Sequence, residues 1–285
     1  MRSINALSSA PAVKQWLANS RQPRILHIFD HACNLINERR DVLSIVAPQI
    51  GNGPFNLVLA DEVCFSTAID IESRIVISSD QLTLGTLNIN TANTKPWNPR
   101  PQWERFHAER AHLFKRLSQL RVADRQVESF VTSLAKNTDL QPLLSALASA
   151  LAHADLSSAR KLAAQLAGAG IGLTPAGDDA LMGAMYAAWI IHPAEVASVL
   201  LQEIANTAAP LTTSLSAAWL RSAGKGEAGE VWHQLFEALL SSGAEPTRMA
   251  VDKILSVGHT SGADALAGFS ASMAASLILP VSISQ

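Results

Sequence analysis

The sequence predicts an α+β protein, with a β-rich N-terminal domain followed by a compact all-α helical domain. Short runs of aliphatic and β-branched residues dominate the first third of the chain, whereas long Ala/Leu-rich segments of helical period dominate the rest. Between them, TANTKPWNPRPQW at 91–103 carries three prolines in a polar context and should be extended. We therefore predict a β-rich domain at 1–92, a proline-rich connection at 93–102 and an α-helical domain at 103–285.

The strand signal lies between Arg24 and Ile89. Turn signals such as GNGP at 51–54 and SSDQ at 78–81 separate the runs RILHIF, VLSIVA, FNLVLA, RIVIS and LTLGTLNI. The glycines of QIGNGPFN also suggest a phosphate loop, but the Lys-Ser/Thr that follows in such loops is missing, which favours a hairpin turn.

Helical periodicity takes over after residue 102. Small residues are frequent and aromatic residues make up only 5% of the chain, so closely packed helices are expected. The predicted helices span 103–121, 124–136, 140–152, 155–167, 176–191, 194–207, 212–223, 228–242, 246–256 and 262–278.

The composition indicates which kinds of binding partner to expect. A net charge of −2 and a pI near 6.4 indicate no basic footprint for nucleic acid. The longest apolar stretch, Ala180–Ile191, is shorter than the ~20 residues of a membrane-spanning helix and predicts a core helix. We therefore expect neither nucleic acid nor a membrane as partner.

Cellular location is also indicated by the composition. The N-terminal segment lacks a continuous apolar core typical of a signal peptide. The two cysteines, Cys33 and Cys64, are too few for a disulfide framework and are expected to be buried thiols. Both features predict a cytoplasmic protein.

The motif GAGIGLTPAGDDALMGAMYAAW at 168–189 places adjacent carboxylates at the start of an apolar helix. Thr174 is the expected N-cap and Pro175 the first helical residue. Asp178 and Asp179 then fall in or after the first turn, where exposed carboxylates gain roughly 0.3–1 kcal/mol from the helix dipole. Adjacent helical positions point about 100° apart, so at least one carboxylate must face something else.

GHTSGADALAG at 258–268 repeats this motif with a one-residue gap. In each copy a second glycine follows the Asp by four residues, on the same helical face, and permits close approach of another backbone. We predict that the two helices pack across Gly183 and Gly268. Asp179 and Asp264 would then lie within ~10 Å of each other, facing one cleft shared with His259. The alternative is a pair of tightly packed helices with no binding role.

The residue types in this region suit a small anionic substrate. Free amides at helix starts attract anions, whereas clustered carboxylates repel them unless Mg²⁺ intervenes or the carboxylates accept hydrogen bonds from ligand amides or hydroxyls. Mg²⁺ is therefore possible, but no cofactor or metal ligand is assigned. The candidate catalytic residues are Asp178, Asp179, Asp264 and His259. The candidate substrate-binding residues are Thr174, Gly177, Thr212, Thr213, Arg221, Thr260 and Gly262.

Two further patterns favour ordinary structural roles. The hydroxyl cluster of APLTTSLSAAWLRSAGKGE at 209–227 is more typical of a helix start than of an anion site completed by Arg221. HIFDH at 27–31 has the spacing of a helical metal site, but its surroundings are strand-like, which separates His27 and His31 by about 13 Å.

The motifs GLTPAGDD, LTTSLSAAWLRSAGKGE and GHTSGADALAG, in this order after a β-rich part, resemble a bacterial family that includes a subunit of the oxamate carbamoyltransferase of anaerobic allantoin breakdown. The resemblance extends over about residues 24–279, and GLTPAGDD is its most specific part. The resemblance implies that the motif residues are important for function, namely Thr174, Pro175, Gly177, Asp178, Asp179, Gly258, His259, Thr260, Gly262 and Asp264.

This resemblance implies a transferase of purine degradation that interconverts oxalurate plus phosphate with oxamate plus carbamoyl phosphate, together with other subunits. Two alternatives stay open on the residues alone. One is a metal-dependent hydrolase with an Asp-rich helical site, and the other is a non-catalytic subunit that binds a small acid for regulation.

Overall fold

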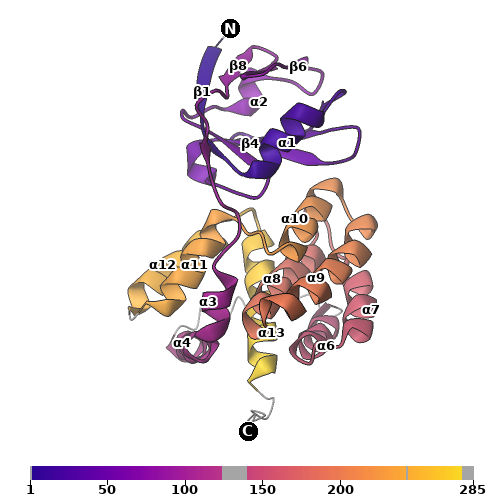
Figure 1. Cartoon of the computed structure of the whole chain (residues 1–285), viewed down its shortest axis with the longest axis vertical. Helices are drawn as coiled ribbons and strands as arrows, with labels where there is room; N and C mark the ends of the chain where they lie inside the picture. The colour runs from indigo at the N-terminus through magenta and orange to yellow at the C-terminus, as the bar shows by residue number, and fades with distance from the viewer. Residues whose placement is uncertain (1, 124–139, 242, 278–285) are drawn as a thin grey trace. The chain divides into compact units, whose positions relative to one another are not determined.

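The computed structural model describes residues 2–123, 140–241 and 243–277 (Figure 1). The chain divides into two compact units, a β unit at Met1–Pro99 and a helical unit at Arg100–Gln285. The predicted order, a β-rich part followed by a helical part, is confirmed. The boundary between the units falls within the proline-rich segment.

The β unit is built on a nine-stranded mixed sheet that nearly closes into a barrel, in the order β2-β3-β4-β5-β1-β8-β7-β6, with β9 paired to β1. β1 pairs antiparallel to β5 and parallel to β8. Its strands are β1 (Arg2–Ser9), β2 (Arg24–Ile28), β3 (Ala32–Ile36), β4 (Val42–Val46), β5 (Asn56–Leu59), β6 (Ile75–Ile77), β7 (Gln81–Leu84), β8 (Leu87–Asn90) and β9 (Lys95–Pro96).

Turn chemistry fixes the hairpins of this sheet. The Asn37 side-chain oxygen accepts the amides of Arg39 and Asp41, at 3.0 and 2.9 Å, and so closes the turn between β3 and β4. Gly85 adopts φ 57° between β7 and β8, in the region where glycine is favoured. The two turns bring apolar runs such as VLSIV of β4, which is buried throughout, into the core of the unit.

Three features of the β unit differ from the sequence prediction. β1 at Arg2–Ser9 lies inside the sheet, although no strand was identified in the sequence before Arg24. Helices α1 (Pro11–Asn19) and α2 (Phe65–Ala68) interrupt the strands. Cys33 is buried as expected, but the expectation for Cys64 is wrong, because its side chain is exposed at the residue before α2.

The helical unit has α8 (Ala176–Ile191) and α13 (Ser261–Ser276) side by side at its centre (Figure 1). The other helices are α3 (Trp103–Ala108), α4 (Arg110–Ala123), α6 (Leu140–Ala152), α7 (Leu156–Leu166), α9 (Ala194–Ala208), α10 (Ser214–Gly224), α11 (Glu230–Leu240) and α12 (Ala244–Leu255). The predicted helix at 103–121 is two helices joined at Glu109, and the one predicted at 124–136 lies outside the described residues.

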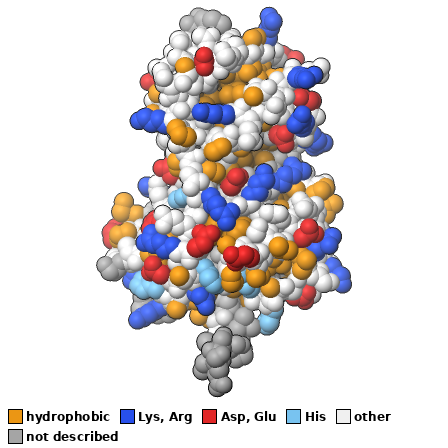
Figure 2. Space-filling view, in the orientation of Figure 1, with side chains coloured by type: hydrophobic (Ala, Val, Ile, Leu, Met, Phe, Trp, Pro, Cys, Tyr) orange, Lys and Arg blue, Asp and Glu red, His pale blue; other side chains and the backbone are white. Residues whose placement is uncertain are grey.

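The core of the helical unit forms around α8, which is buried on nearly all sides. Aromatic side chains gather beside it, with Trp103 stacked on Trp189 at a centroid distance of 5.8 Å. Ala180–Ile191 is thus a core helix segment, as predicted. No helix among the described residues is long and apolar enough to cross a bilayer. On the face drawn in Figure 2, basic and acidic side chains are interspersed.

Candidate functional site

The repeated motif brings α8 and α13 into direct backbone contact. A Cβ added to Gly183 would overlap the carbonyl oxygen of Ala265, and one added to Gly268 would overlap that of Ala180. Each glycine therefore receives the backbone of the opposite helix, in a reciprocal arrangement that side chains would prevent. The prediction that both glycines lie at the helix contact is confirmed.

The first glycine of each copy also packs against backbone. A Cβ at Gly177 would collide with the carbonyl oxygen of Leu166, and one at Gly262 with that of Ile254. The amide of Gly177 donates to the carbonyl of Ala169 at 2.8 Å. Both residues were candidates for substrate binding, and their immediate role is to seat the two helix starts on the preceding segments.

Asp178 holds two loops together. Its carboxylate accepts the amide of Gly168 at 2.9 Å and the hydroxyl of Thr212. The side chain is only 2% exposed, and burial raises its pKa, while the hydrogen bonds from Thr212, Gly168 and Ser216 oppose that shift. Both oxygens are thus engaged within the protein, which gives Asp178 a positioning role.

Thr213 completes this attachment. Its hydroxyl donates to the carbonyl of Leu173 at 2.6 Å and also accepts the amide of Ser216 at 3.1 Å as the N-cap of α10. The segment 168–173 is a loop in which three glycines, Gly168, Gly170 and Gly172, have positive φ. The hydroxyl groups of Thr212 and Thr213 therefore hold the glycine-rich loop 168–173 in place.

Asp179 points the other way, as the 100° helical step requires. It is 6% exposed, and burial raises its pKa to about 8; hydrogen bonds from Ser261 and Thr174 oppose the shift, and repulsion from Asp264 and Asp178 adds to it. Its Oδ2 is buried and has no hydrogen-bond partner among the described residues. At neutral pH the group is therefore mostly a neutral carboxylic acid with an unsatisfied oxygen.

Thr174 reaches across to α13. It was expected to cap α8, but Pro175 occupies the N-cap position and no side chain caps this helix. The Thr174 hydroxyl instead makes a 2.7 Å hydrogen bond with the Ser261 hydroxyl at the first residue of α13. Sequence reasoning missed Ser261, although the motif alignment placed it beside Gly262.

Asp179 lines a cavity of about 210 Å³, called here the α8–α13 cavity. Among the described residues, Thr174 and Ser261 add hydroxyl groups to its wall, and no Lys, Arg or His side chain lines it. The remaining lining residues are Met182, Trp219, Gly229, Val231, Trp232, Ile254, Val257, Gly258, Gly262 and Ala265. The cavity is thus apolar, with a single carboxyl group in its wall.

The apolar part of this wall was not foreseen. Met182 lies three residues after Asp179 and thus on the same face of α8, a signal that the sequence offered. Trp219 and Trp232 come from α10 and α11, and only the tertiary fold brings them to the cavity.

The second copy of the motif does not mirror the first. Asp264 is also 6% exposed, but it does not line the cavity. Burial raises its pKa, and a hydrogen bond from Thr260 opposes that shift. The first-turn carboxylates were expected to be exposed, and this was wrong. His259 was expected in the same cleft, yet it is exposed and outside the lining.

Other predicted site residues also lie apart from the cavity. Arg221 is exposed on α10 and does not line it, and Thr212 is turned to Asp178. His27 lies in a strand, so the spacing of HIFDH does not produce a helical pair. Within the described ranges, no group of three or more His, Cys, Asp or Glu residues is placed to hold a metal ion. The donor set therefore does not fit the Mg²⁺ arrangement.

Two protein-family models match the chain. One, described as oxamate carbamoyltransferase subunit AllH, matches residues 166–273, which include both copies of the glycine and aspartate motif. The other, described as the AllH family N-terminal domain, matches residues 5–96. No solved structure gives a significant match.

Proposed function

The chain belongs to the oxamate carbamoyltransferase subunit AllH family, and from this premise we propose that it serves, with partner subunits, the exchange of a carbamoyl group between oxamate and phosphate. In that exchange, oxalurate plus phosphate and oxamate plus carbamoyl phosphate interconvert. We further propose that the α8–α13 cavity receives the substrate's carbamoyl or carboxamide group. The observation that carries this is the buried Asp179 carboxyl with one unpaired oxygen.

The chemistry of a neutral carboxylic acid supports this assignment. Oxamate, oxalurate and carbamoyl phosphate all carry an H₂N–C(=O) group. A protonated carboxyl donates its O–H to the carbonyl oxygen of such a group and accepts an N–H at its other oxygen. The raised pKa of Asp179, about 8, keeps that proton in place at neutral pH. A substrate amide would thus satisfy the Oδ2 atom that the protein leaves unpaired.

The reaction requires a hydrogen-bond donor at the carbonyl oxygen of the group that is transferred. In carbamoylation of oxamate, the amide nitrogen bonds to the carbamoyl carbon, the carbon–oxygen bond to phosphate breaks with its electron pair leaving on phosphate, and one N–H proton is released. Negative charge grows on the carbonyl oxygen as the nitrogen attacks, and a positioned donor stabilises that charge more than it stabilises the ground state. We propose that the Asp179 O–H is this donor.

The cavity does not suit the anionic ends of the substrates. None of the described residues in its wall is cationic, and apolar surroundings disfavour an unpaired phosphate or carboxylate. We propose that the anionic ends face out of the cavity and meet cationic groups of a partner subunit.

The test is carbamoyl transfer by the chain reconstituted with its partner subunits. We expect Asp179→Leu, which removes donor and acceptor, to lower kcat/KM for oxamate by about 100-fold or more. Asp179→Asn keeps the shape and a weaker N–H donor, so a loss of about tenfold is expected. Asp252→Asn, at an exposed site on α12, is the matched control and should leave the rate unchanged.

Normal turnover by a folded Asp179→Leu complex would refute the role of the cavity. Thermal unfolding of each variant separates loss of fold from loss of chemistry. Binding of substrate without turnover under every condition of reconstitution would favour a regulatory subunit instead.

A further inference from the structure

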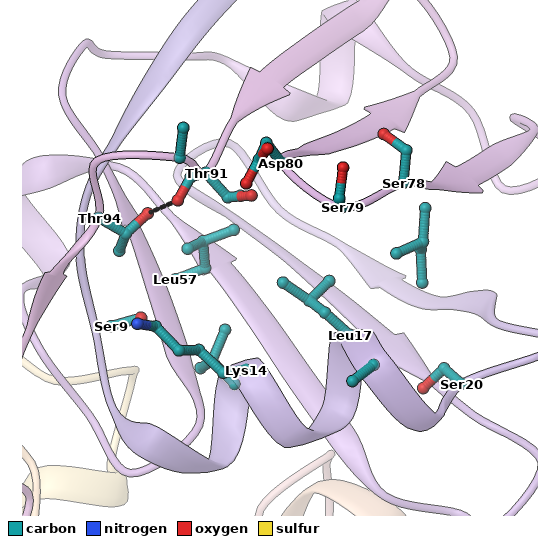
Figure 3. Close-up of a pocket in the computed structure, with 14 residues that line it drawn as sticks. Ser9, Lys14, Leu17, Ser20, Leu57, Ser78, Ser79, Asp80, Thr91 and Thr94 are labelled. Carbon is teal, nitrogen blue, oxygen red and sulfur yellow. Dashed lines mark hydrogen bonds between the residues drawn. The ribbon is translucent and has the colours of Figure 1, made fainter.

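A second and larger cavity, about 600 Å³ in volume, lies within the β unit, where none of the predicted site residues is found (Figure 3). We call it the β-unit cavity. Three segments distant in sequence form its walls, namely helix α1, the β6–β7 turn at 78–80 and the turn at 91–94. Its volume is in the usual range for small-molecule sites, ≈ 300–1,000 Å³.

Backbone hydrogen bonds hold the two turns in place. The amide of Ser78 donates to Gln81 at 2.9 Å, and the amide of Thr91 donates to Asp80 at 2.8 Å. Thr94 closes the second turn with its hydroxyl, which donates to the carbonyl of Thr91 at 2.9 Å. Because backbone groups make these bonds, the side chains of Ser79 and Asp80 are left for other partners.

The wall of this cavity carries one buried hydroxyl group and two charged side chains. Ser9 lines the cavity at the end of β1 and is only 2% exposed. Among the described residues, Lys14 and Asp80 are the charged ones in the wall; both side chains are exposed, and neither forms an ion pair there. In Figure 3 Ser9 and Lys14 lie on one wall, and Ser79 and Asp80 on the opposite one.

Apolar side chains line the cavity between these walls. Val13 and Leu17 of α1, Leu57 of β5 and Ile77 of β6 contribute aliphatic surface, and Val13 and Leu57 are almost fully buried. A few convergent polar groups around an aliphatic surface are the usual composition of a site that orients a small molecule.

We propose that the β-unit cavity binds a zwitterionic α-amino acid with an aliphatic side chain. Lys14 and the Ser9 hydroxyl take the carboxylate, Asp80 and Ser79 take the ammonium, and the aliphatic surface takes the side chain. Lys14 and Asp80 lie on opposite walls, so a molecule that carries both charge signs can pair with both of them at once, whereas a ligand of one sign can pair with only one. This binding site is separate from the proposed carbamoyl transfer.

The test is calorimetric titration of the full chain with L-leucine, 4-methylpentanoate and isopentylamine. The last two keep the aliphatic part and each lacks one charged group. We expect leucine to bind with Kd of about 1 mM or tighter, and each analogue to bind at least tenfold more weakly. Equal affinity for all three, or no heat with leucine, would overturn the proposal, and this comparison uses the unaltered chain.

Variants then assign the residues. Lys14→Met and Asp80→Asn should each weaken leucine binding at least tenfold, whereas Lys95→Met and Asp61→Asn, exposed in the same unit but outside the lining, should not change it. Unchanged binding in the first two variants would also overturn the proposal. Asp179→Leu should leave leucine binding intact, so failure here and failure of the proposed transferase role are distinguishable.

Discussion

Asp178 and Asp179 show how one helical step separates two functions. Asp178 turns to the Gly168 amide and the Thr212 hydroxyl, so both of its oxygens hold loops. Asp179 turns to an apolar cavity and keeps one oxygen unpaired. The difference in surroundings, rather than in residue type, makes one carboxyl a positioning group and the other a group available to a ligand.

The raised pKa of Asp179 makes stability depend on pH. Its value is 3.8 ordinarily and about 8 in the folded chain. Between these values the unfolded chain has lost a proton that the folded chain keeps, so stability is greatest at low pH and falls as pH rises toward 8. The slope attributable to one proton is at most about 1.4 kcal/mol per pH unit.

Asp179→Asn should remove this contribution. We expect urea unfolding at pH 5, 6, 7 and 8 to give a free energy of unfolding that falls less steeply with pH in the variant than in the unaltered chain. Asp178 and Asp264 also have raised pKa values, but both remain in the variant and cancel in the comparison. Identical slopes would show that Asp179 is ionised in the folded protein.

At the scale of elements, the sequence predicted helices well where the helical period was clear. α6 and α8 have the predicted bounds, and the glycine contact of α8 with α13 followed from the repeat. α1 was missed, although Pro11 stands at its start, because it is short and lies among strands. Burial of Asp179 could not be predicted, because Trp219 and Trp232 reach the cavity only through the packing of other helices.

The contact between α8 and α13 should tolerate no side chain at its glycines. Gly183→Ala and Gly268→Ala would each place a methyl group against a backbone carbonyl that cannot move aside. We expect each to lower the free energy of unfolding by about 1–3 kcal/mol or more, despite the better helix propensity of alanine. Chemical denaturation measures this.

Gln202→Ala on the exposed face of α9 is the control and should change stability by about 0.5 kcal/mol or less. Stability equal to that of the unaltered chain in both glycine variants would show that the helices can separate without loss.

At the scale of the whole molecule, the chain consists of two compact units that each contain a cavity of their own. All residues that line the β-unit cavity lie in Met1–Pro99, and all that line the α8–α13 cavity lie in Arg100–Gln285. The order of a β-rich and a helical part was readable from composition and period. The β-unit cavity was not, because its three segments meet only after the sheet has formed.

Residues 100–285 expressed alone are therefore expected to keep the pH dependence of stability that Asp179→Asn removes. Every group that raises or lowers the pKa of Asp179 belongs to this unit. Urea unfolding of the fragment, with and without the substitution, checks this. A fragment without a cooperative transition, or one whose stability is indifferent to Asp179→Asn between pH 5 and 8, would contradict it.

The reciprocal glycine contact between α8 and α13 also bears on when, during synthesis, the pKa of the Asp179 carboxyl rises. Gly183 and Ala265 are more than 80 positions apart, and α13 follows every other described helix. A nascent chain that has just produced α8 still exposes the glycine face, and its Asp179 is hydrated and as acidic as in a peptide. Ser261, Gly262 and Ala265, which close the cavity, arrive with the last described helix. Docking of α13 is therefore expected to complete the burial that raises the pKa of Asp179.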